Sequence, residues 1–219
     1  MGIRILYSDP QLCICIKPAG VSSEGDGMPS LLKAVFPGSD VFPVHRLDQS
    51  VGGVMVYALD RKAAAALTEL FAGSAVRKEY LAVIPGIPES QDGIFTDLLY
   101  HDKRSNKTYV VKNERKGVRK AGLAWICQKT VETEDGSLSL MRVALHTGRS
   151  HQIRIQFASR KMPLVGDGKY GSRIKAPGIA LWSYRLAFRH PVTGEMLDFS
   201  REPDRNQFPF NLLSAEQGT

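Results

Sequence analysis

The sequence is poor in cysteine, and it has no long apolar run. Three cysteines among 219 residues do not make a disulfide framework, so the expected compartment is the reducing cytoplasm. No stretch reaches the ~18 consecutive apolar residues that a membrane-spanning helix needs. The N-terminus, MGIRILYSDPQ, lacks the basic and apolar segments of a secretory signal. The sequence therefore argues against a disulfide scaffold, a secreted protein and a membrane protein.

Motifs for nucleotides and metals are also missing from the sequence. It contains no G-x-x-x-x-G-K-[ST] phosphate loop. Its cysteines and five histidines do not have the spacing of zinc ligands. Cys13 and Cys15 alternate within an apolar run, which is typical of small core residues. We therefore predict neither a phosphate-loop nucleotide site nor a metal site.

Acidic residues are scarce in two segments of an otherwise ordinary chain. Hydrophobic residues make up 43% and charged residues 23%, which excludes disordered, collagen-like and coiled-coil classes. The net charge of +7 is uneven, since residues 101–120 carry +6, residues 142–189 carry +9 and the remainder −8. Basic segments attract polyanions, nucleic acid foremost. A solvated surface without a partner is the plain alternative.

The apolar pattern predicts an α+β fold with few helices and a mostly antiparallel, mixed sheet. Helices are expected from Pro29 to Phe36, over 61–73 after an Asp60 cap, and over 150–159 with Ser150 as cap. Residues 86–93 are the best break between two lobes, or else a surface loop. Runs of strand length occupy 3–7, 12–17, 53–58, 79–84, 122–131, 138–146, 179–189 and 196–200.

Three segments bring together side chains with chemical potential. One is His45-Arg46-Leu47-Asp48, followed by Gly52-Gly53, which leaves backbone room near the acid. Another, over 147–154, places several donors around a helix start, where anions bind readily. In the third, Tyr80 is the one aromatic residue of an apolar strand. Taken singly, each also fits a structural role, as a surface ion pair, a capped helix and a core tyrosine.

Taken together, five motifs in this order resemble the RluA-type family of RNA pseudouridine synthases. They are ILYSDPQLCICIKPAG with its Lys17-Pro18-Ala19-Gly20, HRLD, KEYLAV, GRSHQIR and PLVGDGKYG. The resemblance extends over most of the chain and implies an isomerase that converts uridine in RNA to pseudouridine without a cofactor. It further implies a single catalytic domain over 1–219, without the family's N-terminal RNA-binding domain. Its two lobes are expected to flank a catalytic cleft.

The resemblance also assigns roles to residues. Asp48 matches the family's nucleophile or base, and Arg154 matches the cation that keeps this acid ionised. Tyr80 matches an active-site aromatic that stacks on uracil and helps to move a proton. Arg46 matches a residue that displaces the target base, and Leu164 an apolar residue of the pocket. We also expect His45, Arg149, His151 and Gln152 to bind substrate, and Lys103, Arg104 and Lys107 to contact RNA.

The chain departs from the family pattern at Val51-Gly52-Gly53, where members usually have Thr-Ser-Gly. This departure leaves two other hypotheses open. One is an RNA-binding module that has lost catalysis, although Asp48, Tyr80 and Arg154 are retained. The other is a metal-dependent hydrolase or phosphotransferase, although the motifs offer no second carboxylate. The expected partner is a compact stem-loop of rRNA or tRNA, bound by a monomer without an obligatory protein partner.

Overall fold

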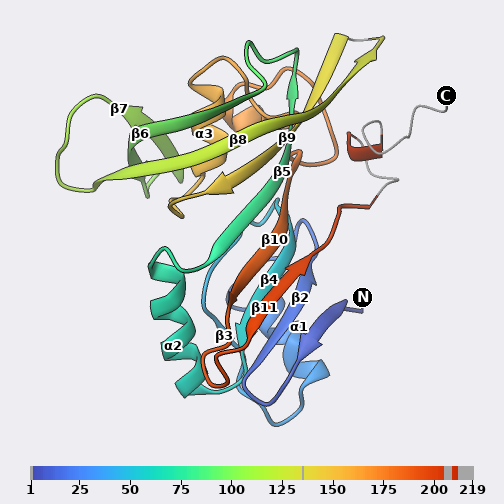
Figure 1. The fold of residues 1–219 in the computed structure, drawn as a ribbon, viewed down its shortest axis with the longest axis vertical. Helices are drawn as coiled ribbons and strands as arrows, with labels where there is room; N and C mark the ends of the chain where they lie inside the picture. Colours follow the sequence, from blue (N-terminus) through green and yellow to red (C-terminus); the bar gives the residue numbers. More distant parts are fainter. Residues whose placement is uncertain (1, 135, 205–208, 212–219) are drawn as a thin grey trace. The chain divides into compact units, whose positions relative to one another are not determined.

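The computed structural model describes residues 2–134, 136–204 and 209–211 (Figure 1). The chain divides into two compact units. Unit 1 is Met1–Lys78 with Trp182–Glu202, and unit 2 is Glu79–Leu181 with Pro203–Thr219. The segment 86–93, expected at a break between lobes, lies within unit 2 and connects two of its strands. The expectation of a single catalytic domain stays a prediction.

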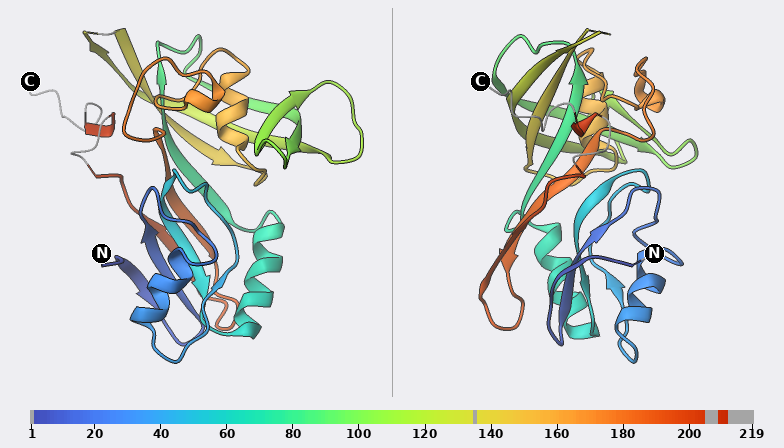
Figure 2. Two further views of the ribbon diagram at one scale, coloured as in Figure 1. Left: turned by 180° about the vertical axis from the view of Figure 1, so that it is seen from behind. Right: turned by 90° about the vertical axis from the view of Figure 1, so that its right-hand side faces the viewer.

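Unit 1 is a sheet with a helix on each face (Figure 2). The helices are α1 (Met28–Val35) and α2 (Arg61–Ala72). Among the pairs that the structure describes in this unit, only β4 and β10 run parallel. The strand order is β1 (Ile5–Ser8), β2 (Leu12–Lys17), β4 (Gly52–Ala58) and β10 (Leu181–Arg189), with β3 (Phe42–Pro43) on β4 and β11 (Met196–Ser200) on β10.

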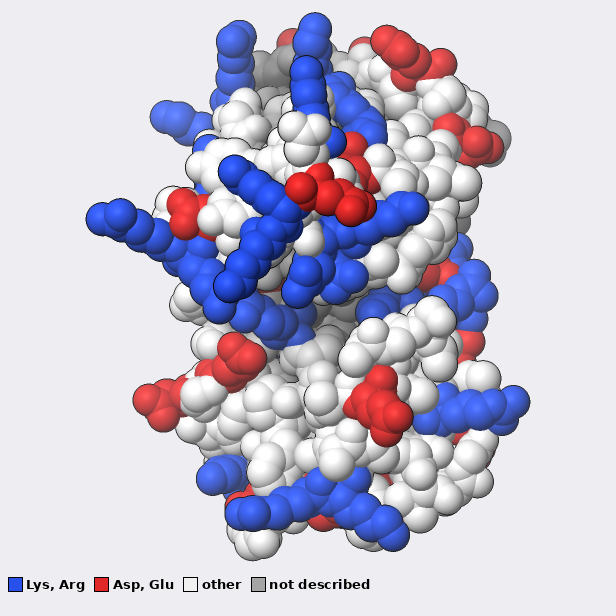
Figure 3. Space-filling view, turned by 90° about the vertical axis from the view of Figure 1, so that its left-hand side faces the viewer, with Lys and Arg blue, Asp and Glu red and all other residues white. Residues whose placement is uncertain are grey.

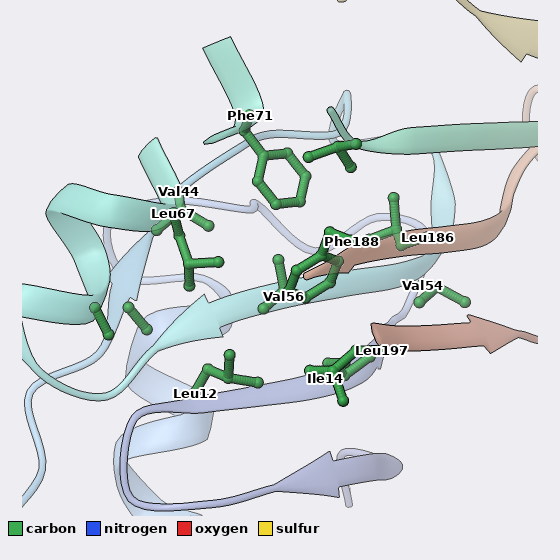
Figure 4. Packing of buried hydrophobic residues seen from close by; sticks show 13 residues of the cluster. Leu12, Ile14, Val44, Val54, Val56, Leu67, Phe71, Leu186, Phe188 and Leu197 are labelled. Carbon is green, nitrogen blue, oxygen red and sulfur yellow. The ribbon is translucent and has the colours of Figure 1, made fainter. Parts of the chain in front are cut away.

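The core of unit 1 lies between its sheet and α2 (Figure 4). Alternate residues of a strand point to the same face, so Leu12 and Ile14 of β2 both reach this core. From α2, Leu67 and Phe71 project from successive turns into it. The Asp60 side chain accepts a hydrogen bond from the Ala63 N–H (2.9 Å), which starts α2 where the sequence predicts.

Unit 2 is an antiparallel sheet covered on one face by a short helix. Phe157 of the helix α3 (Gln152–Ala158) packs against the rings of Phe95 and Trp125, with centroids 5.2 and 6.2 Å away. A 3-10 turn, η1 (Gly168–Tyr170), follows α3. The strand order is β5 (Arg77–Pro85), β9 (Gly136–Leu145), β8 (Val118–Thr133), β6 (Asp92–Asp102) and β7 (Lys107–Val111).

The α+β class and the mostly antiparallel, mixed sheet are confirmed. Strands β6 and β7 were not expected, and the turn between them and the loop after β7 hold most of the basic residues of segment 101–120. The predicted Ser150 cap is wrong, because α3 is preceded by His151 in a left-handed conformation (φ 52°) without a side-chain cap. No helix within the described ranges is long and apolar enough to cross a membrane. The catalytic cleft stays a prediction.

Leu67→Ala is expected to lower the free energy of unfolding by about 2–4 kcal/mol. Leu67 is fully buried in the core of unit 1, so the truncation leaves a cavity. Thr68→Ala, on the exposed side of the same helix, is the control and should change it by less than about 0.5 kcal/mol. Urea unfolding followed by circular dichroism measures both. Equal effects of the two changes would contradict the described packing.

Candidate functional site

Asp48 lies half-buried in unit 1, on the segment between β3 and β4. Its carbonyl oxygen accepts a hydrogen bond from the Val51 N–H (2.9 Å), which closes a tight turn. The residue before it is held by Ser23, which is buried. The Leu47 N–H donates to Ser23 Oγ (3.0 Å), and that hydroxyl donates to the Leu47 carbonyl (2.8 Å). The backbone therefore reaches Asp48 in a fixed position.

The residue after Asp48 is held by Lys17, the last residue of β2. The Lys17 side chain is fully buried. Its ammonium group donates to the carbonyl oxygens of Pro18 (2.9 Å), Val21 (2.6 Å) and Gln49 (3.2 Å). The Gln49 carbonyl also accepts from the Gly20 N–H (2.8 Å). The Lys-Pro-Ala-Gly motif thus ties the start of one loop to the backbone beside Asp48.

Lys17 also places a positive charge near the acid. Burial lowers the pKa of Lys17 to about 8, and attraction by the Asp48 carboxylate acts in the opposite direction. Lys17 was not among the residues predicted to form the site. The signal that could have identified it was its place in the Lys17-Pro18-Ala19-Gly20 motif.

Gly52 and Gly53 are required by the neighbouring strand β10. A Cβ atom at position 52 would lie 2.6 Å from Cζ3 of Trp182. Gly53 has φ +125°, and a Cβ there would lie 2.3 Å from the Ser183 carbonyl oxygen. The backbone room expected near the acid is therefore filled by β10. The Trp182 ring takes the space that a serine at position 52, usual in the family, would need.

His45 is packed into unit 1. Its ring stacks on Phe71 of α2, with centroids 4.4 Å apart and planes 10° apart. Its Nε2 accepts the Val56 N–H (3.2 Å). Burial and then the nearby charge of Lys78 lower the pKa of His45 to about 3, so the ring is neutral. Arg46, by contrast, is exposed. Substrate contact by either residue stays a prediction.

In unit 2, Arg154 of α3 is buried in an ion pair. Its Nε donates to Asp167 Oδ2 (2.7 Å) and its Nη2 to Asp167 Oδ1 (2.9 Å). The guanidinium carbon lies 5.0 Å from the centre of the Tyr170 ring. Tyr80 lies buried on β5, opposite Val143 of β9. Asp167 and Tyr170 were not predicted as site residues, although both belong to the last motif, PLVGDGKYG.

Tyr170 connects α3 to the strand β7. Its hydroxyl accepts the Thr108 N–H (2.8 Å) and lies 2.8 Å from His151 Nδ1. Burial raises the pKa of Tyr170. His151 itself is buried, and its left-handed backbone is a conformation that non-glycine residues seldom adopt. The hydroxyl contact holds the His151 side chain against Tyr170, whose ring also lies under the Arg154 guanidinium group.

The other candidates of this segment shape the turn before α3. Gln152 Oε1 accepts from the Thr147 hydroxyl (2.7 Å) and the Arg149 N–H (3.0 Å), and its Nε2 donates to the Gly122 carbonyl (3.0 Å). Arg149 is exposed, and its Nε donates to the Lys120 carbonyl (3.2 Å). Leu164 is fully buried. Their roles toward a substrate stay predictions.

The basic segment 101–120 forms the end of β6, the strand β7 and the start of β8. Lys103 and Arg104 are exposed in the turn between β6 and β7. The Lys107 ammonium lies 5.8 Å from the Tyr109 ring centre and 5.7 Å from that of Tyr170. Figure 3 shows Lys and Arg side chains gathered on one face of unit 2, in the upper part of the view. This face is suited to a polyanion.

The structure brings some predicted residues together. Within unit 2, Lys107, His151 and Arg154 meet around Tyr170. Within unit 1, Asp48 interacts with Lys17, which was not a predicted site residue. Across the described part of the chain, no group of three His, Cys, Asp or Glu side chains is placed to hold a metal ion.

Comparison with known families decides the class of the protein. Residues 11–159, more than half of the chain, match the family described as RNA pseudouridylate synthase. The chain belongs to this family. Its enzymes are isomerases, and the resemblance to the RluA-type synthases is confirmed by the relatives that follow.

Similar proteins are found in several bacteria. Ribosomal large subunit pseudouridine synthase D of Xanthomonas campestris is 32% identical over 218 residues, which cover 88% of this chain and 63% of that protein. tRNA pseudouridine synthase C of Pasteurella multocida is 28% identical, over 90% of each chain. An uncharacterised RNA pseudouridine synthase of Aquifex aeolicus is 29% identical, over 96% of this chain and 73% of its own length.

Solved structures share the fold. Human RNA Pseudouridylate Synthase Domain Containing 1 aligns with a TM-score of 0.79 and 21% identity, over 93% of this chain and 84% of that chain. Human RNA Pseudouridylate Synthase Domain Containing 4 aligns with a TM-score of 0.75 and 22% identity, over 93% and 89%. At this level of identity the likeness concerns the fold alone.

Lys17→Met is expected to change how stability depends on pH. The folded pKa of about 8 lies below the ordinary lysine value of 10.5, so between these values the unfolded chain binds more protons. The unchanged protein should therefore gain stability over the variant as pH rises from 8 to 10.5, by at most about 3 kcal/mol. Urea unfolding at four pH values tests this, with Lys62→Met on α2 controlling for a lost surface charge. A pH-independent difference for Lys17→Met would refute the burial of its charge.

Proposed function

We propose that this protein isomerises specific uridines in structured RNA to pseudouridine, with Asp48 as the essential carboxylate and without a cofactor. In this reaction the bond from ribose to uracil N1 breaks, the base turns, and ribose is rejoined to carbon 5. The proton displaced from carbon 5 leaves, and N1 gains one. Nothing is oxidised or reduced, so the balance needs neither a redox partner nor an energy donor. Family membership and the five ordered motifs support the proposal.

The observation that carries the role of Asp48 is the support of its backbone on both sides. Ser23 holds the residue before it and Lys17 the residue after it, so the carboxyl group is presented from a rigid loop. The charge of Lys17 attracts the carboxylate, and the ionised form is the one that acts as nucleophile or base. Attack on the ribose, attack on the uracil ring and formation of a glycal all start from this carboxylate.

Other residues complete the proposed reaction. We assign to Tyr80 stacking on uracil and proton movement, and to Arg154 the task of keeping Asp48 ionised at the substrate. Arg46 would hold the gap after the target base leaves its stack, a step that costs a few kcal/mol. Leu164 would contribute an apolar wall. The polar groups of His45, Arg149, His151 and Gln152 would bind the substrate or shape the loops that do.

The proposed substrate is a stem-loop of ribosomal or transfer RNA. Two of the relatives described above are named for these two RNA classes. The basic face of unit 2 supports a polyanionic partner, since phosphate contacts supply most of the affinity for nucleic acids. We further propose that the protein acts in the cytoplasm as a monomer and without an obligatory protein partner.

Asp48→Asn should abolish pseudouridine formation and leave folding and RNA binding nearly unchanged, because the amide keeps the shape and loses the charge. Bulk RNA from a host that lacks the gene is incubated with each protein, digested with nuclease and analysed by chromatography. Asp26→Asn removes an exposed acid of the same unit and should stay fully active. Full activity of Asp48→Asn would reject the mechanism.

Two further results bear on the alternatives. RNA binding without turnover by the unchanged protein would favour the module that has lost catalysis. Loss of turnover in excess chelator would favour the metal-dependent enzyme.

Replacing Lys103, Arg104 and Lys107 together with Ala should weaken RNA binding and flatten its salt dependence. Three lost phosphate contacts reduce the slope of log Kd against log salt by about 2 to 3. Filter binding between 50 and 300 mM salt measures the slope, and single-turnover assays should show little change in the step on bound RNA. Replacing Lys33, Arg61 and Lys62 removes the same charge from exposed positions of unit 1. Equal slopes for the two triple variants would mean that net charge, and not this hairpin, governs binding.

A further inference from the structure

The ion pair between Arg154 and Asp167 is the most deeply buried one that the structure describes. The side chains are only 6% and 1% exposed. Two hydrogen bonds, from Nε and Nη2 to the two carboxylate oxygens, fix the plane of the guanidinium group as well as its position. This fork geometry is specific to arginine, because a lysine ammonium is a point charge without a plane.

Stability alone does not explain a pair of this kind. The neighbours Ile153 and Phe157 on the same helix are apolar core residues. A buried ion pair is often no more stabilising than apolar residues of similar volume, because both charges lose their hydration. The presence of a guanidinium group at this position therefore indicates a requirement for its charge and geometry.

Tyr170 restrains the same guanidinium group from another side. Its ring lies under the guanidinium carbon at 5.0 Å. Its hydroxyl is held by the Thr108 N–H of β7 and contacts His151 Nδ1, so the ring cannot turn away without breaking these contacts. Asp167 fixes the edge of the Arg154 group, and Tyr170 fixes its face.

We propose that Asp167 is a positioning residue for pseudouridine formation, acting through Arg154, and that Tyr170 completes this support. The inference rests on the proposed function, in which Arg154 acts at the substrate. Asp167 itself is 1% exposed and fully engaged with Arg154, so its effect is transmitted through the guanidinium group. A displacement of about 1 Å at such a group costs about 100-fold in rate.

The test is a double-mutant cycle with Asp167→Asn, Arg154→Lys and both changes together. A matched control is Asp97→Asn. Asp97 of β6 accepts from both terminal nitrogens of Arg160 (2.9 and 3.2 Å) and from Gln156 Nε2 (2.7 Å), which lie on α3 or just after it. That change breaks a second acid–arginine pair of unit 2 without touching Arg154. Single-turnover rates at saturating protein, RNA Kd values and thermal unfolding are measured for each.

We expect Asp167→Asn to slow the single-turnover rate about 10- to 100-fold and to leave Kd within about threefold. The double variant should be as slow as Arg154→Lys alone, because a residue that acts through Arg154 has no effect once that group is altered. Asp97→Asn should lose stability and keep its rate within about threefold. These results together would establish a role beyond structural support.

Three outcomes of these measurements would overturn the proposal. One is a rate for Asp167→Asn equal to that of Asp97→Asn. Another is a double variant whose rate falls by the product of the two single-variant factors, because that result means that Asp167 and Arg154 act independently. The third is no turnover by the unchanged protein, which rejects the proposed function as well, whereas the first two leave that function intact.

Tyr170→Phe keeps the proposal testable if Asp167→Asn does not fold. It removes only the hydroxyl group and keeps the ring under Arg154. The expected result is a rate about 3- to 10-fold lower at unchanged Kd, since one hydrogen bond contributes about 1 kcal/mol. An unchanged rate in this variant would overturn the role of the Tyr170 contact and, with it, the proposal.

Discussion

A single buried ammonium group, that of Lys17, organises the loop that carries Asp48. Three carbonyl oxygens point toward the same small volume, from Pro18, Val21 and Gln49. Their dipoles would repel one another without a shared donor, and an ammonium group offers three N–H bonds, one for each acceptor. Burying this ammonium group removes its hydration, which disfavours the charged form and lowers the pKa of Lys17. One residue thus supplies both the shape of the loop and a positive charge near the acid.

Unit 2 uses a buried cation in a comparable way. Arg154 and Asp167 join α3 to the turn that precedes η1, and Tyr170 adds a connection to β7. A seven-residue helix is too short to be stable by itself, so these polar contacts and the Phe157 packing hold it in place. In both units, the residues proposed to act in the reaction are held in place through satisfied polar groups, which specify one geometry better than apolar packing alone.

Sequence patterns predicted the regular parts of this structure better than its polar contacts. The helix α2 was predictable because Asp60 caps an Ala- and Leu-rich segment with apolar residues on one face. The strands β6 and β7 were not, since their apolar alternation is interrupted by charged residues and their turn is made by Asn106 with a positive φ. The Arg154–Asp167 pair is separated by 13 residues, a spacing that no periodicity reveals. The motifs identified the family, while the partners of each motif residue depended on tertiary contacts.

The parallel pairing of β4 with β10 has a consequence for the synthesis of the chain. Gly52 and Gly53 lie against Trp182 and Ser183, about 130 positions later in the sequence. Leu186, Phe188 and Leu197 then fill the core of unit 1. A ribosome must therefore translate residues 79–181, the part of unit 2 that interrupts unit 1, before the segment around Asp48 acquires its neighbour strand. Because non-local pairings form slowly in general, we expect the segment that carries Asp48 to reach its final form only after β10 has been made.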